Sequence, residues 1–401
     1  MEQTLELPME SRPRLKFIDM ARSIAILMML EGHFTGAALS SEYRSDSFLL
    51  YNIWHNIHGL TSPLFFTVTG VIFVYLLSSN NSISYFKNIR VKKGFKRVFQ
   101  LIFWGYFIQL NIWSIVQSIY YQSEFHFDWL YAFHVLQSIG VGIFFLLAIY
   151  GIYKWINKGY LYWYYLVAGI IIFTFYGMMK SHINEQEKLI TDGIINIPKY
   201  IPSGFPKFIQ NMFYGQYSDF SFIRYSGYTI LGGMLGSIIR INEDKAKKWW
   251  FGTSFIVAGI LLGIFAQPIF RNLDSFIEYI GLTNQSTFEF NNTAFARFGQ
   301  VVSVLGILML IDKFWNVQAK LFLKIGQNTL PIYIVHVIIL YGGIFGFGLK
   351  PYAFDMNLNP YVSFLVSVTF ILFFTIMVKY IEPLERLYSN FINLFSFKKQ
   401  K

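Results

Sequence analysis

Four ionisable side chains, Asp19, Arg22, Glu31 and His33, lie within one otherwise apolar stretch, residues 18–39. That stretch is long enough to cross a bilayer, and ionisable groups inside a membrane are costly and usually functional. Arg22 and His33 are eleven residues apart, so on a helix they lie about 20° apart around the axis and about 16 Å apart along it. They therefore share one face, with a fixed positive charge near one membrane surface and a titratable imidazole deeper in. This arrangement favours a pathway into the membrane.

Asp19 lies three residues before Arg22, a spacing that lets its carboxylate reach the guanidinium and hold it charged. A structural interpretation is the alternative: Asp19 and Arg22 would mark the cytoplasmic boundary, and His33 would be a hydrogen-bonded histidine of a helix bundle. We favour the functional interpretation because His33 lies about 22 Å along the helix from Ile18. That is too deep for a side chain that only reaches back to the membrane surface.

A second cluster of polar residues opens the next apolar segment, WHNIHGLTSPLFF. Here His55 and His58 have the i, i+3 spacing of one helix face. Two histidines at this spacing also occur in zinc sites, but no nearby carboxylate or third histidine completes a ligand set, so we expect no metal. Structural histidines at the membrane interface explain the pair about as well as catalysis does.

A third cluster lies in the segment GQNTLPIYIVH near the end of the chain. Asn328 precedes Pro331, which interrupts the hydrogen-bond ladder of a helix, and Tyr333 and His336 follow. Backbone groups freed at such a break must be satisfied by protein or water, so we expect this segment to line a cavity. Simple kinked packing is the alternative. Between these clusters, FHVLQSIGVG places a histidine and a glutamine three residues apart, and a glycine stripe, Gly232, Gly233 and Gly236, favours close helix packing.

The composition is that of an all-α, polytopic integral membrane protein. Of the 401 residues, 54% are hydrophobic and 14% are charged, whereas soluble domains use roughly 25% charged residues. The apolar segments predict about ten membrane spans. They are 18–39, 57–78, 96–118, 131–153, 160–179, 220–239, 249–267, 295–312, 325–347 and 360–381. The predicted organisation is a cytoplasmic N-terminal segment 1–17, a transmembrane domain 18–381 and a cytoplasmic basic tail 382–401.

The net charge of +11 is explained by topology. Basic residues gather in the segments before the third span, after the fourth and before the seventh, and at the chain ends, which places these segments and both termini in the cytoplasm. Nucleic-acid binding is therefore not expected. Lys92 and Lys399 are predicted to be cytoplasmic, and Asn211 and Asn291 to face outside. The basic segment before the third span is predicted to be a loop.

The opposite side carries longer polar segments, 40–56, 119–130, 180–219, 268–294 and 348–359. Aromatic residues there either stack on sugar rings or form an interfacial belt; they include Trp54, Tyr120, Tyr121, Trp129, Tyr214 and Tyr217. The chain has no cysteine, which excludes disulfides and thiolate chemistry. We find no P-loop, dinucleotide-binding, HExxH or GxSxG motif. We therefore expect any catalytic chemistry to come from the histidines in the membrane spans.

Four segments, in their order along the chain, carry a family resemblance: RLKFIDMARSIAILMMLEGHF, HGLTSPLFFTVTGVIF, FHVLQSIGVG and GQNTLPIYIVH. Together they resemble the heparan-α-glucosaminide N-acetyltransferase catalytic-domain family of the transmembrane acyltransferase superfamily. The sister acyltransferase-3 family shares the arginine and histidine of the first segment and the late segment. Two features depart from the pattern: Ser23 stands where the family commonly has glycine, and we expect about ten spans where the lysosomal enzyme has eleven.

The resemblance implies acyl transfer from cytosolic acetyl-CoA, across the bilayer, to a sugar or related acceptor outside. It assigns His33 and His58 to catalysis, with a histidine as general base, and Arg22 to donor binding. Asp19, Asn328, Tyr333 and His336 are the expected supporting or substrate-binding residues. Direct transfer and an acetyl-histidine intermediate both stay open.

The expected location is a bacterial plasma membrane, and a homo-oligomer stays open. Two other classes of function were weighed. A proton-coupled transporter or flippase of an envelope precursor would use the same buried groups as a proton relay, but we find no internal repeat typical of transporters. A non-catalytic membrane scaffold would tolerate substitution of the histidines.

Overall fold

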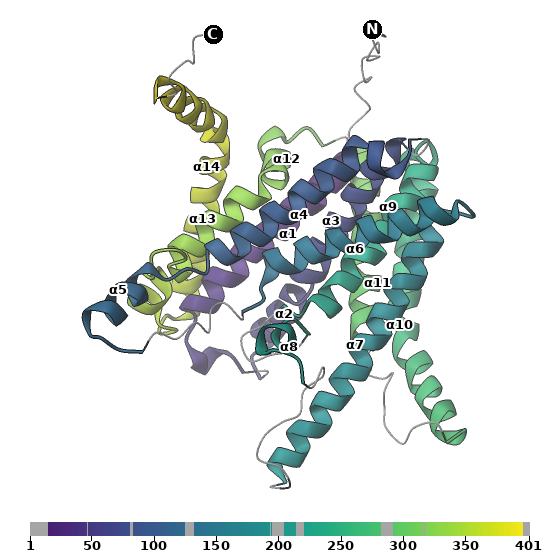
Figure 1. Cartoon of the computed structure of the whole chain (residues 1–401), viewed down its shortest axis with the longest axis horizontal. Helices are drawn as coiled ribbons and strands as arrows, with labels where there is room; N and C mark the ends of the chain where they lie inside the picture. The colour runs from purple at the N-terminus through teal and green to yellow at the C-terminus, as the bar shows by residue number, and fades with distance from the viewer. Residues whose placement is uncertain are drawn as a thin grey trace.

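The computed structural model describes residues 15–45, 47–80, 83–124, 132–192, 194, 204–213, 220–281, 292–315 and 317–395. Within these ranges the chain is helical, and its extended pairing is limited to two isolated bridges, Leu39 with Leu358 and Asn111 with Ile344. The all-α fold class is confirmed (Figure 1). Lys399, Asn291, Trp129, Tyr214 and Tyr217 lie outside the described residues.

The helices occur in this order along the chain. The first seven are α1 (Lys16–Ala38), α2 (Leu49–His58), α3 (Thr61–Leu77), α4 (Ile89–Phe107), α5 (Ile112–Tyr120), α6 (Val135–Ile156) and α7 (Leu161–Thr191). The others are α8 (Lys207–Phe213), α9 (Phe222–Ile241), α10 (Trp249–Tyr279), α11 (Asn292–Trp315), α12 (Lys320–Gln327), α13 (Thr329–Tyr341) and α14 (Pro360–Phe395). A π-helical turn, Lys350–Phe354, lies between α13 and α14.

Among the described residues, six helical segments are long and apolar enough to cross a membrane: 49–77, 135–156, 161–191, 249–279, 293–315 and 360–382. The bent pair formed by α12 and α13 makes a seventh if it is one span. Helices α1, α4 and α9 also lie in predicted spans but are not among the six. The chain is thus a polytopic membrane protein, and the count of about ten spans stays a prediction.

Helix α1 lies in the middle of the helices that carry the conspicuous polar residues. It packs on α3, α11, α12, α13 and α14. Its side chains are buried on more than one face, including Ala21, Ala25, Leu30 and Phe34. A helix that is apolar nearly all round belongs inside a bundle rather than at its rim. This position surrounds the polar residues of α1 with other helices.

The predicted packing role of the glycine stripe on α9 is confirmed. A Cβ atom at Gly232 would meet the carbonyl oxygen of Thr67 on α3, and one at Gly236 would meet that of Val71. From the other side, a Cβ atom at Gly70 of α3 would meet the carbonyl oxygen of Thr229. The backbones of α3 and α9 touch because both helices lack side chains at the crossing.

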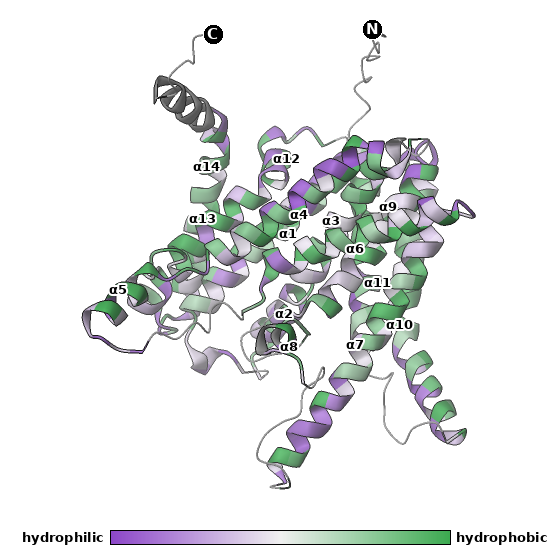
Figure 2. Cartoon of the chain, viewed as in Figure 1, coloured by the Kyte–Doolittle hydropathy of each residue, from purple (hydrophilic) through white to green (hydrophobic). Residues whose placement is uncertain are grey.

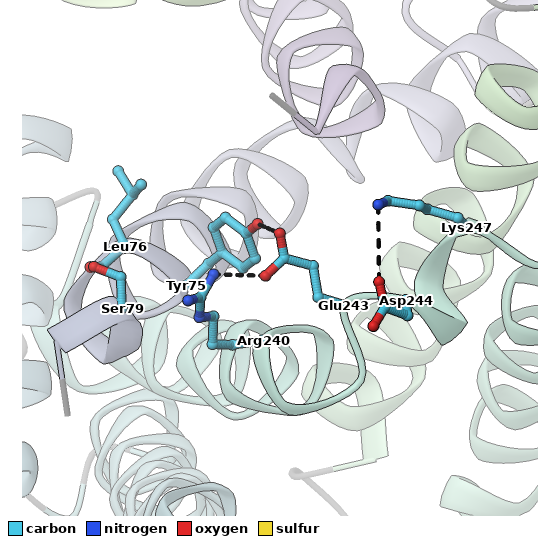
Figure 3. Close-up of polar contacts among 7 residues, drawn as sticks. All are labelled: Tyr75, Leu76, Ser79, Arg240, Glu243, Asp244 and Lys247. Carbon is cyan, nitrogen blue, oxygen red and sulfur yellow. Dashed lines mark hydrogen bonds and ion pairs between the residues drawn. The ribbon is translucent and has the colours of Figure 1, made fainter. Parts of the chain in front are cut away.

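The ends of α3 and α9 on the predicted cytoplasmic side are joined by a polar cluster (Figure 3). The carboxylate of Glu243 accepts a hydrogen bond from the hydroxyl of Tyr75 at 3.0 Å and one from Arg240 Nη1 at 2.6 Å. The Arg240 guanidinium also lies over the Tyr75 ring, 5.4 Å from its centroid. Nearby, Lys247 and Asp244 form a looser, exposed pair at 3.9 Å. The cluster fixes the connection that leads from α9 to α10.

Two predicted boundaries near the third span are wrong. The basic segment predicted to be a loop is already helical, because α4 begins at Ile89 and Asn88 caps it by accepting a hydrogen bond from the Arg90 N–H at 2.9 Å. The predicted span 96–118 is not continuous, since α4 ends at Phe107 and α5 begins at Ile112. Figure 2 shows the hydrophilic start of α4 and its apolar continuation.

Two outer segments predicted to be loops are partly helical. Helix α7 continues to Thr191 and α10 to Tyr279, so both extend beyond the predicted ends of their spans at 179 and 267. In Figure 1 these ends project from the bundle on the side opposite the chain termini. The projecting end of α7 is hydrophilic (Figure 2).

At the end of the chain, α14 runs without interruption through the predicted boundary at 381 to Phe395.

Candidate active site

His33 and His336 lie side by side although they are 303 residues apart. His33 comes from α1 and is partly buried, and His336 comes from α13 and is fully buried. Nδ1 of His33 is 3.1 Å from Nε2 of His336. One of these nitrogens must donate and the other accept, so the contact fixes the proton positions of both rings together.

Aromatic rings hold the histidine pair on both sides. The ring of Tyr341 meets the His33 ring edge-on with centroids 5.8 Å apart, and Tyr333 meets His336 in the same way at 4.9 Å. Tyr333 itself is 6% exposed. These contacts restrict the rotation of both imidazoles, which is what a group that transfers protons at a fixed position requires.

A third histidine, His58, is held by a different set of contacts. Its ring stacks on the indole of Trp54 with centroids 5.2 Å apart and planes 2° from parallel. The Trp54 N–H points at the carboxylate of Glu31, 2.9 and 3.0 Å from its two oxygens. The His58 ring also lies against Gly32, where a Cβ atom would collide with it. Through Trp54, a carboxylate of α1 therefore holds His58 of α2 against α1.

The hydroxyl of Thr35 adds a second hydrogen bond to Glu31, at 2.9 Å, and lies 2.8 Å from Ser367 of α14. His58 and His33 both line a small pocket of about 40 Å³ beside α3. The structure therefore brings the three predicted histidines to one place, with His33 between the other two.

A cavity of about 190 Å³ lies beside this cluster, toward the N-terminal end of α1. It is lined by two arginines, Arg22 and Arg97. We call it the arginine cavity. Arg22 Nη2 donates a hydrogen bond to the hydroxyl of Thr329 at 3.3 Å. The remaining walls are mostly apolar side chains of α3, α4 and α6. Two guanidiniums in an apolar cavity are suited to a ligand that has a phosphate at one end and a less polar chain at the other.

A larger cavity of about 550 Å³ lies on the other side and is lined by His33 and by polar residues of the turn after α4, of α6 and of the segment after α13. We call it the histidine cavity. The two cavities share Leu136 and Tyr333 as wall residues. A long ligand bound at Arg22 and Arg97 would therefore have to pass Tyr333 to reach His33.

A scan against protein-family models matches residues 15–381 to the acyltransferase-3 family, described as an acyltransferase domain. The match covers most of the chain and includes every residue of both cavities. The chain belongs to the acyltransferase-3 family. The protein is therefore a membrane acyltransferase. A comparison with curated proteins found no match.

Acyltransferase-3 is the family whose first-segment arginine and histidine and late segment this chain shares. The more specific resemblance, to the heparan-α-glucosaminide N-acetyltransferase family, stays a prediction. One of its two departures has a structural explanation: the Ser23 hydroxyl lies 2.5 Å from the carbonyl oxygen of Phe322 and accepts the Gly326 N–H at 2.9 Å. In this acyltransferase-3 protein a serine at that position joins α1 to α12.

Two supporting residues lie outside the histidine cluster. Asp19 is 2% exposed and lies one turn before Ser23. Asn328 lies at the break between α12 and α13, where the helices bend by 74°, and its side chain donates to the carbonyl oxygen of Lys324 at 2.8 Å. Pro331 was predicted to cause this break. It occupies the first turn of α13, and a continuous helix would need its missing N–H to bond to the carbonyl of Gln327, the last residue of α12, so the predicted interruption of the helix is confirmed.

The histidines of the segment WHNIHGLTSPLFF lie near the start of the candidate span 49–77. Both lie on the separate helix α2, which ends at His58 before the turn at Gly59. His55 is exposed and stacks on Tyr51, whereas His58 stacks on Trp54. In the part of the chain that the structure describes, no group of three or more His, Cys, Asp or Glu side chains could hold a metal ion.

Several residues of this candidate site were not predicted from the sequence. Arg97 was assigned to a basic loop that was used only to predict the membrane topology. For Trp54 two roles stayed open, stacking on a sugar ring and membership of an interfacial aromatic belt. Glu31 was noticed but given no role, although it anchors Trp54. The available signal was Glu31 itself, because a carboxylate deep in an apolar helix requires a hydrogen-bond donor.

Proposed function

We propose that this protein transfers an acetyl group from cytosolic acetyl-CoA to a hydroxyl or amine of a glycan acceptor on the outer side of a bacterial plasma membrane. The observation that carries the proposal is the position of His33. It lines the histidine cavity, which adjoins the arginine cavity through Tyr333. A donor that enters past the arginines and an acceptor that enters from the other side would meet at this imidazole.

The proposed general base is Nε2 of His33. In the tautomer that suits this role, His33 Nδ1–H donates to His336 Nε2 and leaves His33 Nε2 free to accept a proton. The acceptor oxygen or nitrogen attacks the thioester carbonyl while His33 takes its proton. The C–S bond then breaks, a C–O or C–N bond has formed, and the proton passes from His33 to the CoA thiolate.

His336 is a positioning residue in this scheme. By accepting from Nδ1 it keeps the His33 ring in one tautomer and stabilises the imidazolium that forms during transfer. His58 belongs to the acceptor side, since it shares a small pocket with His33. Held by Trp54, it is placed to orient the acceptor or to relay the proton.

The proposed donor site is the arginine cavity. Arg22 and Arg97 would meet the phosphates or the pantetheine end of acetyl-CoA, and the apolar walls would enclose the chain that carries the thioester. Asp19, Asn328 and Thr329 would support the arginine and the helix break beside it. Family membership favours this transfer over the transporter, which would need no acyl donor.

The test uses purified protein in lipid nanodiscs with radiolabelled acetyl-CoA. We expect saturable binding of acetyl-CoA and transfer of label to envelope glycans from cells that lack the protein. Denatured protein and labelled acetate are the controls. Absence of acetyl-CoA binding at millimolar concentration would contradict the proposal. Label retained on the protein after acceptor is withheld would favour the acetyl-histidine route over direct transfer.

A further inference from the structure

Two amide side chains in the histidine cavity have buried atoms without a hydrogen-bond partner. Gln137 of α6 is 0% exposed, and its Oε1 accepts from the backbone N–H of His134 at 3.3 Å. Its Nε2 is buried and has no hydrogen-bond partner among the described residues, and the same holds for Oε1 and Nε2 of Gln109. Buried polar groups normally form hydrogen bonds, so amide atoms that line a cavity without such a bond are available to bind a ligand.

The backbone keeps space for this arrangement. A Cβ atom at position 105 would come within 2.6 Å of Gln137 Cδ, so glycine at this position leaves room for the amide. Gly105 lines the same cavity as Gln109 and Gln137. The unpaired amides therefore belong to a shaped wall between α4 and α6.

The same cavity contains a cation. Lys350 lines it from the π-helical turn after α13, and its ammonium lies 5.6 Å from the centroid of the Tyr341 ring. Tyr341 in turn contacts the His33 ring edge-on. Among the described residues that line the cavity there is no aspartate or glutamate. The positive charge of Lys350 therefore favours a negative group in this cavity, at a place separated from His33 by the Tyr341 ring.

We propose that Gln109, Gln137 and Lys350 form a subsite for an anionic group, a phosphate or carboxylate, on the acceptor glycan. Lys350 binds the charge, the amide N–H groups donate to the anion or to neighbouring sugar oxygens, and Gln109 Oε1 accepts from a sugar hydroxyl. The inference rests on the proposed function, because it assumes that the histidine cavity is the acceptor site. It adds that the acceptor is an acidic glycan.

The experiment identifies the charge of the product. Protein in nanodiscs receives radiolabelled acetyl-CoA and the whole envelope fraction of cells that lack the protein, so the natural acceptor is present whatever its structure. The labelled glycan is digested to repeat units and separated by anion exchange. We expect the labelled unit to be retained as an anion. Loss of retention after phosphatase treatment identifies phosphate, and loss after amidation with carbodiimide identifies a carboxylate.

The residues are tested on the same acceptor fraction. Lys350→Gln is expected to raise KM for the acceptor roughly ten- to a hundredfold, the value of one hydrogen bond to a charged group, with a smaller change in kcat. Lys350→Arg should restore most of the affinity. Lys379→Gln is the matched control, because Lys379 also lies over a tyrosine ring, that of Tyr380 at 5.3 Å, but outside the cavity. Acetyl-CoA binding verifies that each variant is folded.

The outcomes separate the two proposals. A labelled repeat unit that is neutral, or an acceptor KM that Lys350→Gln leaves unchanged in a folded variant, overturns the anionic subsite while acyl transfer stands. If the wild-type protein transfers no label to any part of the envelope fraction, the proposed function fails and the subsite fails with it.

Discussion

At the scale of single residues, three histidines of one chemical type are placed in three different surroundings. His33 has one ring nitrogen committed to His336 and borders a cavity, His336 is enclosed, and His58 is stacked on an indole. A general base needs one ring nitrogen available beside a cavity, which excludes the enclosed His336 but not His58, since His58 lines the small pocket with His33. Burial and partners, rather than residue type, therefore distinguish the roles that we assign to them.

The positioning role of His336 predicts a specific pattern of rescue. His336→Leu removes the acceptor for His33 Nδ1–H, and we expect kcat to fall about a hundredfold with little change in acetyl-CoA affinity. His336→Gln keeps a carbonyl oxygen that can accept the same hydrogen bond and should recover part of the loss. The pH profile of kcat should shift in the leucine variant and return in the glutamine variant. Equal activity of both variants would show that His336 only fills space.

The contact between Glu31 and Trp54 predicts a coupled pair. Trp54→Phe leaves the ring stacked on His58 but removes the indole donor, at a cost of about 1–3 kcal/mol in unfolding free energy for the carboxylate left short of donors. Because Glu31→Leu removes the acceptor of the same hydrogen bond, the double variant should be less destabilised than the sum of the single ones. Thermal unfolding of all three variants measures this, with Trp155→Phe, at an 85% exposed site, as control. Additive changes would mean that the two side chains are not coupled.

At the scale of helices, the arginine cavity depends on how closely α12 approaches α1. A Cβ atom at Gly326 would meet the backbone carbonyl of Asp19 and the Ser23 hydroxyl, both on the turn that carries Arg22. Backbone atoms cannot move aside as a flexible side chain can. The packing of α1 on α12 is therefore a requirement for the position of Arg22.

Gly326→Ala is expected to separate α12 from α1, to lower the free energy of unfolding by about 1–3 kcal/mol and to weaken acetyl-CoA binding. Gly263→Ala on α10 is the matched control, because a Cβ atom there meets nothing within 4 Å. The control variant should be as stable as wild type or more so. Unfolding by heat and donor binding by calorimetry test both variants, and an unaffected Gly326→Ala would refute the requirement.

Much of the helix order could be predicted from sequence, and the errors have physical causes. The apolar segments predicted where helices lie because their length and composition are local properties. The start of α4 was missed although Asn88 is a typical N-cap, since clustered lysines and arginines gave a stronger topological signal. The bend at Asn328 was predictable, because a helix cannot continue unbroken through Pro331 and this is a local property of the sequence.

The site could be predicted only where a residue was anomalous by itself. Arg22 and His33 stand out in an apolar helix, so sequence alone selected them. The approach of His336 to His33 was not predictable, because it depends on how α13 packs on α1 across 303 residues. The unpaired amides of Gln109 and Gln137 give no sequence signal, because only the packed cavity shows that they lack partners.

At the scale of the whole molecule, the proposal needs the two cavities to open toward opposite sides of the membrane. The absence of native cysteine makes this testable with single-cysteine variants. Lys92→Cys, on the exposed side of α4, should react with an impermeant maleimide only after the cells are opened. Tyr279→Cys, at the 87% exposed end of α10, should react in intact cells. Labelling of position 92 in intact cells would reverse the predicted topology.

The central claim is that His33 acts as the general base of acetyl transfer. The most direct test compares wild type, His33→Ala and the control His182→Ala, a histidine on the projecting end of α7, in the radiolabel transfer assay and in acetyl-CoA calorimetry. We expect His33→Ala to lose about 10²–10⁴-fold in turnover while it binds acetyl-CoA as wild type does, and His182→Ala to change neither quantity. A folded His33→Ala protein that transfers acetyl groups at the wild-type rate would contradict the claim.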